Sequence, residues 1–290
     1  MAVVESSRGS PFVLSMDASR DVRESTSRGT GLLVAKAMED PGIDQVVVAL
    51  GGTGCLDGGM GFLEAVEAEF YDRQRRRLEG RAKNLMHVHE IKVPRLPKPL
   101  TGLYDTFVPL LGLTGAVALY GPQKGVSVSM QGRFEEALEH YAQVVQGSRR
   151  VVNDAGTGAA GGIGFAIKVA EGTLEPGARR ISEWMKLGER IKNADWIITG
   201  EGRLDRQSLL GKVVGTVLEE GKRWHKPVVA VVGSYPLNLT PFYERGLTSV
   251  WTLVPGPTPL EESIENTAHL LQSAGENLGR MLVRGNEFEG

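Results

Sequence analysis

The 290-residue chain contains a single cysteine, Cys55, so it can form no disulfide within itself. Its formal net charge is only −2 at pH 7, which leaves no excess of either sign to attract nucleic acid or an anionic membrane surface. The first residues lack the apolar stretch of a secretory signal, and no apolar run reaches the length of a membrane span. We therefore expect a cytoplasmic protein whose partners include neither nucleic acid nor a membrane.

Two common nucleotide-binding motifs are also missing. Gly211 and Lys212 are followed by Val213 rather than by Ser or Thr, so the chain has no P-loop. The segment GTGAAG at 156–161 has the glycine spacing of a dinucleotide-binding loop, but no convincing strand precedes it. NAD is therefore a minor alternative, and any use of ATP requires another architecture.

Glycine, by contrast, is abundant, with 38 residues that gather in short clusters. Between the clusters, short β-branched runs alternate with amphipathic segments, which predicts an α/β protein with parallel sheets. The expected strands are 45–50, 86–94, 114–121, 194–199, 226–234 and 249–256. The expected helices are 29–40, 61–80, 132–146, a segment after 164, 208–224 and 261–283. The Pro-Gly pair at 176–177 suggests a boundary between two domains, residues 1–175 and 176–290.

Three glycine clusters follow predicted strands, at 51–61, 156–164 and 200–202. Ligands of doubly wound sheets bind beyond the carboxyl ends of the strands, and bare backbone N–H groups can hold an anion there. We expect these loops to bind phosphate or carboxylate groups. The alternative is that they are tight turns between packed elements.

Charged residues accompany these loops. Lys124 lies in GPQKG (121–125), where it can meet a phosphate or carboxylate. The segment TGEGRLDRQSLLGK (199–212) is dense in acidic, basic and amide side chains, which can hold Mg²⁺ or accept a hydroxyl proton. In both segments, solvated loop residues are the alternative.

Two further groups of residues are explained more simply by the structure of the chain than by a binding function. His87 and His89 would share one face of a strand, where an exposed face is a simpler explanation than a metal pair. The arginines at 73 and 75–77 indicate a solvated helix end, with a polyanion-binding patch as the alternative.

Five motifs occur in the order and approximate spacing of the bacterial glycerate kinase family, which the chain resembles from about residue 2 to its end. They are STSRGTG (25–31, with one extra residue), GGTGCLDGGMG (51–61), GPQKG (121–125), GAAGGIG (158–164) and TGEGRLDRQSLLGK (199–212). The resemblance implies two Rossmann- or flavodoxin-like α/β domains around a cleft. It also implies transfer of the ATP γ-phosphoryl group to D-glycerate with Mg²⁺, commonly at the 2-hydroxyl.

The resemblance also suggests roles for individual residues. We expect Asp57, Lys124 and Asp205 to be catalytic, with Asp205 also the metal ligand. We expect the substrate and phosphate groups to be bound by Gly51, Gly52, Thr53, Gly58, Gly59, Glu201, Arg203, Gln207 and Lys212.

The chain departs from the family pattern in three places. The family's Asp-Ser-Phe-Lys-Gly and Ala-Asp-Gly-Gly-Glu-Gly-Thr segments do not occur, so we expect a C-terminal domain without some of the family's strands. Cys55 and Leu56 replace Thr-Asn, and Val108 replaces Asn, which indicates a weakened site or a changed substrate. Three hypotheses follow: a glycerate kinase, a non-catalytic homologue that binds a small anion or a partner protein, or an incomplete gene product. The sequence leaves open whether the chain forms a homo-oligomer.

Overall fold

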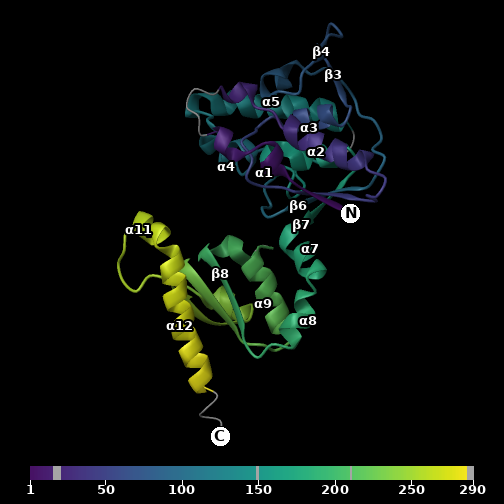
Figure 1. Ribbon diagram of the computed structural model, residues 1–290. Helices are drawn as coiled ribbons and strands as arrows, with labels where there is room; N and C mark the ends of the chain where they lie inside the picture. The colour runs from purple at the N-terminus through teal and green to yellow at the C-terminus, as the bar shows by residue number, and fades with distance from the viewer. Residues whose placement is uncertain (16–20, 148–149, 210, 286–290) are drawn as a thin grey trace. The chain divides into compact units, whose positions relative to one another are not determined.

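The computed structural model describes residues 1–15, 21–147, 150–209 and 211–285. The chain divides into two compact units, Met1–Gly177 (unit 1) and Ala178–Gly290 (unit 2), each with its own parallel sheet (Figure 1). Among the described residues, no helix is both long and apolar enough to cross a membrane.

Unit 1 is built on a four-stranded parallel sheet in the order β1-β2-β6-β7. Its strands are β1 Ala2–Glu5, β2 Val46–Ala49, β6 Leu100–Tyr104 and β7 Thr173–Pro176. All five residues of β6 are buried, as expected for an inner strand covered on both faces. The predicted α/β class with parallel sheets is confirmed.

Helices cover this sheet. The α-helices are α1 Ser6–Gly9, α2 Arg28–Glu39, α3 Met60–Ala65, α4 Ala116–Tyr120, α5 Val128–Gln146 and α6 Ile163–Val169. The 3₁₀ helices are η1 Phe12–Ser15, η2 Val22–Glu24, η3 Ala82–His87, η4 Pro122–Lys124 and η5 Ala159–Gly162. Helix α5 buries Phe134, Leu138, Tyr141 and Val145, the face that its periodicity predicts.

The helix predicted over 61–80 is wrong beyond its first residues. Helix α3 ends at Ala65, and Glu67 adopts a left-handed conformation with φ +70°. The chain then forms an antiparallel sheet in the order β4-β3-β5, with β3 Glu69–Tyr71, β4 Arg77–Leu78 and β5 Glu90–Lys92. Pairing with a distant strand overrides the local helical preference of this segment. The first two residues of the strand predicted over 86–94 are likewise the end of η3, and the strand itself is only β5.

The strand predicted over 114–121 is helix α4, and β6 is a strand that the sequence did not indicate. A short apolar run fits either kind of element, and the alanines of this one favour a helix. In β6, Gly102 interrupts the run of apolar and β-branched residues from which a strand would be predicted. A side chain there would meet Leu174 Cδ2 at 2.7 Å and Ile167 Cδ1 at 2.9 Å, so the close packing of this strand requires glycine.

Unit 2 holds a three-stranded parallel sheet in the order β10-β9-β8. Its strands are β8 Ile197–Arg203, β9 Val228–Ser234 and β10 Leu247–Thr252. Its helices are α7 Gly177–Trp184, α8 Leu187–Lys192, η6 Arg206–Leu209, α9 Val213–Arg223, α10 Thr240–Glu244, α11 Leu260–Glu265 and α12 Thr267–Gly285. Helix α9 packs on β8 and β9, and the core gathers between them around Leu218, Val228 and Ala230.

Two predictions in unit 2 are wrong in detail. Gly200–Gly202 is not a loop after the strand but part of β8, where a side chain on Gly200 would lie 2.3 Å from the Val231 carbonyl oxygen. The single helix predicted over 261–283 is two helices. They are separated at Asn266, whose side-chain amide donates to the Glu262 carbonyl.

Candidate functional site

A pocket of about 270 Å³ lies in unit 1, beyond the carboxyl ends of three parallel strands. Residues after β1, β2 and β6 line it, together with residues of α4, η4 and η5. The lining residues are Phe12, Leu50, Gly51, Gly52, Thr53, Asp105, Thr106, Tyr120, Gln123, Lys124, Ala159 and Ala160. The location is the one at which α/β sheets commonly bind ligands.

Lys124 is the cation of this pocket. It ends η4, which begins with Pro122 and is closed by Gly125 at φ +93°. The side chain is only 6% exposed, and its Nζ donates to the Cys55 carbonyl oxygen at 2.9 Å and lies 3.5 Å from the Thr53 hydroxyl. Burial lowers the pKa of the ammonium group. No described carboxylate lies within ion-pair distance of Lys124, so its charge is available to an anion in the pocket.

The start of the glycine loop forms another part of the pocket wall. The Ser6 side chain holds Gly51 through both the N–H and the carbonyl of that residue, each at 3.0 Å, and the Phe12 N–H donates to the Gly52 carbonyl. A methyl group on Gly51 would meet no protein atom within 4 Å, whereas Gly52 has a left-handed φ of +62°. Beside Gly51, the pocket therefore has room for a ligand to approach the backbone.

Two polar side chains of this pocket, Asp105 and Tyr120, were not predicted as site residues. Asp105 follows β6 and is exposed, and Tyr120 ends α4 with its ring centroid 5.8 Å from Lys124 Nζ. Burial raises the pKa of Tyr120. Both were missed because the elements that carry them were not recognised. In the sequence, Asp105 is notable only because it lies three residues before Val108, one of the departures from the family pattern.

Asp57, predicted as catalytic, lies outside the pocket lining and is fully buried. Its carboxylate accepts hydrogen bonds from the Ser27 N–H at 2.7 Å, the Ser27 hydroxyl at 2.8 Å, and the N–H groups of Gly61 and Gly59 at 3.0 and 3.2 Å. Burial raises the pKa of Asp57, and these donors oppose that rise. The geometry is that of a carboxylate that fixes a loop.

Gly58 and Gly59 also serve packing. Both have left-handed φ values, and a side chain on Gly58 would lie 2.8 Å from Leu138 Cδ2 and 2.9 Å from Tyr141 Cε1. A side chain on Gly59 would meet Ala166 Cβ at 2.4 Å. Neither residue lines the pocket, and the binding role predicted for them from the motif stays a prediction.

Two of the apolar departures from the family pattern lie in the interior, and the third, Val108, is half-buried. Cys55 is 1% exposed and Leu56 is fully buried, and neither lines the pocket. Burial raises the pKa of the Cys55 thiol to about 12, so it is a packed thiol rather than a reactive one. Val108 is also outside the pocket lining, and its carbonyl accepts the Gly158 N–H.

In unit 2, Asp205 precedes η6 and caps it. Its Oδ1 accepts the N–H groups of Gln207 at 2.7 Å and Ser208 at 3.3 Å, and the Ser208 hydroxyl accepts the Asp205 N–H. This arrangement is a reciprocal helix cap. It occupies one carboxylate oxygen, and no described residue hydrogen-bonds to Oδ2.

Glu201 and Arg203 lie two residues apart on β8, and Lys212 precedes α9. Glu201 Oε1 is buried without a hydrogen-bond partner among the described residues, as in a site completed by a ligand. The described part of the chain also offers Arg203 and Lys212 no ion-pair partner. No group of three metal-ligating side chains is present among the described residues. Mg²⁺ does not require such a group, because it commonly binds through one or two carboxylates, water and substrate phosphates.

Comparisons with known proteins identify the family of the chain. The profile of the glycerate kinase family matches residues 1–283. The chain belongs to the glycerate kinase family. Membership of this family makes it a kinase, that is, a phosphotransferase.

Individual relatives agree with this. The chain is 32% identical to a glycerate kinase of Halalkalibacterium halodurans, over 96% of this chain and 75% of that protein. It is 32% identical to the glycerate 2-kinase of Escherichia coli K12, over 98% and 76% of the respective chains. A solved glycerate kinase 2 structure from Salmonella typhimurium LT2 superimposes with a TM-score of 0.77 at 30% identity, covering 98% of this chain and 76% of that chain.

Proposed function

We propose that the chain transfers the γ-phosphoryl group of ATP to the 2-hydroxyl of D-glycerate, with Mg²⁺ as cofactor. The observation that carries this proposal is the unit 1 pocket. It joins the open backbone at Gly51 to a buried Lys124 that has no ion-pair partner among the described residues. Its volume of about 270 Å³ is smaller than that of pockets for drug-sized ligands and suits a three-carbon acid. The E. coli relative at 32% identity carries the name glycerate 2-kinase, which supports the choice of hydroxyl.

Within the pocket, the chemistry of the lining residues gives each a role. The Lys124 ammonium and the backbone at Gly51–Thr53 bind the carboxylate of D-glycerate, since an ammonium held in a dry pocket strongly favours an anion. Asp105 is the carboxylate that lines the pocket. It accepts a hydrogen bond from the substrate hydroxyl and so orients that group. Asp57 acts as a positioning residue that fixes the loop.

The residues of unit 2 fit a magnesium–nucleotide group. Glu201 Oε1 and Asp205 Oδ2 are carboxylate oxygens of the kind that hold Mg²⁺, and Arg203 and Lys212 are cations that neutralise phosphate oxygens. Bound Mg²⁺ with ATP supplies the phosphoryl group and offsets its charge during transfer. Gln207 lies beside Asp205 as a further donor. We place this reaction in the cytoplasm, where ATP is available.

The test is a coupled assay of ADP release by the purified 290-residue chain with D-glycerate, ATP and Mg²⁺. Phosphorus NMR of the product distinguishes 2-phosphoglycerate from 3-phosphoglycerate. We expect turnover that requires all three reactants and yields the 2-phosphate. Binding of D-glycerate without turnover, by a chain that is folded by circular dichroism, would instead indicate a non-catalytic homologue.

Matched variants separate site residues from bystanders. Lys124→Met removes the ammonium group and keeps the length of the side chain. We expect kcat/KM to fall by about 10²–10³-fold, as for other preorganised groups of this kind. Lys36→Met is the control, because Lys36 is an exposed lysine of α2 in the same unit. An equal loss in both variants would contradict the role of Lys124.

Asp205→Asn tests the metal role in unit 2. Asparagine caps helices as well as aspartate does, so η6 should remain intact. We expect the apparent affinity for Mg²⁺ to fall, whereas Asp195→Asn, at an exposed position of the same unit, should leave it unchanged. Unchanged Mg²⁺ dependence in Asp205→Asn would exclude Asp205 as a ligand.

A further inference from the structure

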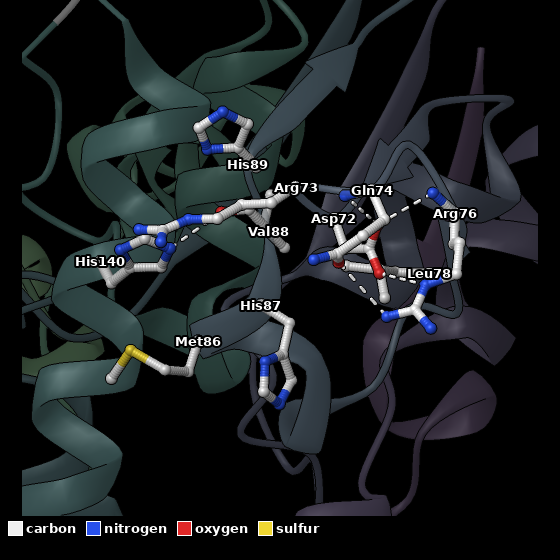
Figure 2. Close-up of a pocket in the computed structure, with 10 residues that line it drawn as sticks. All are labelled: Asp72, Arg73, Gln74, Arg76, Leu78, Met86, His87, Val88, His89 and His140. Carbon is white, nitrogen blue, oxygen red and sulfur yellow. Dashed lines mark hydrogen bonds and ion pairs between the residues drawn. The ribbon is translucent and has the colours of Figure 1, made fainter.

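A second pocket, of about 440 Å³, lies in unit 1 and shares no lining residue with the candidate substrate pocket (Figure 2). Its volume is within the range of small-molecule sites. Basic and imidazole side chains line it from three separate elements: the turn between β3 and β4, the end of η3 with the residues after it, and α5. Neither the family comparison nor the proposed reaction assigns a role to it.

The first wall is the tight turn that begins at Asp72. The Asp72 Oδ1 accepts the N–H groups of Gln74 at 2.8 Å and Arg76 at 2.9 Å, and its Oδ2 accepts Arg76 Nε at 2.7 Å. The Arg76 N–H is the main cause that lowers the pKa of Asp72, so this carboxyl is ionised and its charge is offset by the Arg76 guanidinium. The turn leaves Arg73 without a hydrogen-bond or ion-pair partner among the described residues.

The other two walls carry the histidines. His87 ends η3, and His89 is held beside β3 by its N–H, which donates to the Tyr71 carbonyl at 2.8 Å. His140 on α5 places Nε2 at 2.8 Å from the Val88 carbonyl, a bond in which the ring must donate. In Figure 2, the Arg73 side chain extends toward the side of the pocket where His140 lies. The rings of His87 and His89 have no partner within the described part of the chain.

These groups favour an anion over a metal ion. The only carboxylate in the lining is Asp72, which is already satisfied by three donors. No set of three ligating side chains has a geometry suited to a metal ion within the described residues. Arg73 brings up to five N–H donors, and the rings of His87 and His89 can each add a donor. A tetrahedral phosphate group accepts hydrogen bonds from several sides, whereas a planar carboxylate offers only two oxygens.

We propose that this pocket, formed by Arg73, His87, His89 and His140, is a second anion site that binds inorganic phosphate or the phosphate of a monoester. The site is independent of the proposed kinase reaction. It assigns the polyanion-binding patch, suggested by the arginine run, to Arg73. Arg73 is the one arginine of that run without an ion-pair partner among the described residues, and it lines the pocket.

The five histidines of the chain provide a direct readout. His87, His89 and His140 line the pocket, whereas His225 and His269 lie in unit 2 and serve as internal references. We would titrate the whole chain with inorganic phosphate at constant pH and ionic strength and follow the imidazole signals by NMR. We expect saturable shifts of the three pocket histidines at millimolar phosphate, with smaller shifts when acetate replaces phosphate.

Two arginines of the same turn form a matched pair of variants. Arg73 lines the pocket, whereas Arg75 does not line it and has φ +60°, a conformation that asparagine tolerates. We expect Arg73→Asn to weaken phosphate binding by about tenfold, the effect of losing one strong charged hydrogen-bonding partner. Arg75→Asn should leave the affinity within about twofold.

His87→Gln provides a second variant that does not alter the turn, and it should also weaken binding. Equal weakening by Arg73→Asn and Arg75→Asn would overturn the proposal, because it would indicate only the general charge of the turn. Non-saturating shifts, or equal shifts of His225 and His269, would overturn it as well.

Discussion

The buried carboxylate of Asp57 allows a sharp test of how the glycine loop is held. Asp57→Asn keeps the size of the side chain but replaces one acceptor oxygen with an NH₂ group. Asp57 receives four hydrogen bonds, all from N–H or O–H donors of Ser27, Gly59 and Gly61. The Ser27 hydroxyl also accepts the Phe62 N–H at 2.8 Å, so its own proton is directed to Asp57. The NH₂ group of an asparagine at this position would therefore face another donor, and no hydrogen bond can form between two donors.

The expected loss of stability follows from the number of hydrogen bonds that the substitution weakens or removes. If the asparagine oxygen replaces Oδ2, three hydrogen bonds remain, each weaker by about 1 kcal/mol because the acceptor is neutral. The fourth bond is lost, and a buried donor without a partner costs about 1–3 kcal/mol more. Removing a buried charge offsets part of this loss. We expect unit 1 to lose about 3 kcal/mol of stability, which raises the population of opened molecules about 100-fold.

The position of the single cysteine makes this measurable. Cys55 lies two residues before Asp57 and is 1% exposed, so a thiol reagent reaches it only when unit 1 opens. All four tryptophans lie in unit 2, at positions 184, 196, 224 and 251. Labelling of Cys55 should therefore accelerate about 100-fold in Asp57→Asn, while the unfolding transition followed by tryptophan fluorescence changes little.

The control is Asp205→Asn, which alters an aspartate that accepts backbone N–H groups in unit 2 and should not change Cys55 labelling. An acceleration of less than about threefold in Asp57→Asn would refute the reasoning. It would mean that the four contacts of Asp57 do not hold the loop.

Three further predictions concern the same loop. Because burial raises the pKa of Cys55 from 9.0 to about 12, its stabilising effect is fully present below pH 9 and is lost between pH 9 and 12. From pH 8 to pH 10 the wild type should lose about 1.4 kcal/mol more stability than Cys55→Ala in urea denaturation, and equal losses would contradict this. Gly58→Ala should destabilise unit 1 by about 3 kcal/mol, since its methyl group meets Leu138 and Tyr141 at a left-handed φ; Cys55 labelling would reveal this. Gly51→Ala should leave stability within about 0.5 kcal/mol but raise KM for D-glycerate about tenfold, because its methyl group projects into open space beside the pocket. An unchanged KM would show that no ligand approaches Gly51.

Elements with strong local patterns were predictable from the sequence. Helix α5 has five buried apolar residues at helical spacing, and β2 and β9 are short runs rich in valine. The β4-β3-β5 sheet could not be predicted in this way. Its centre, β3, is a three-residue strand that pairs with β4 on one side and with β5, about twenty residues further along the chain, on the other. Strand β6 was missed for a related reason, since its glycine is explained by neighbours from other elements.

The candidate site was predictable only in part. The motifs identified Gly51, Thr53 and Lys124, which the fold brings together across about seventy residues. They gave no indication that Asp57 is turned inward, because its role depends on Ser27, thirty residues earlier. No local sequence pattern marks Asp105 as a candidate site residue. Its proposed role depends on its position at the end of β6, a strand that the sequence did not indicate.

The dense glycine segment at 51–61 combines two physical requirements within one motif. At its start, Gly51 borders open space in the pocket, where only a ligand would approach the backbone. At its end, Gly58 and Gly59 are crowded by helices α5 and α6, and their left-handed conformations allow the loop to turn into α3. Asp57 stands between these halves and ties the turn to the start of α2 through Ser27. The glycines of this segment therefore serve packing in one half and the proposed ligand binding in the other, and substitution at each position separates the two.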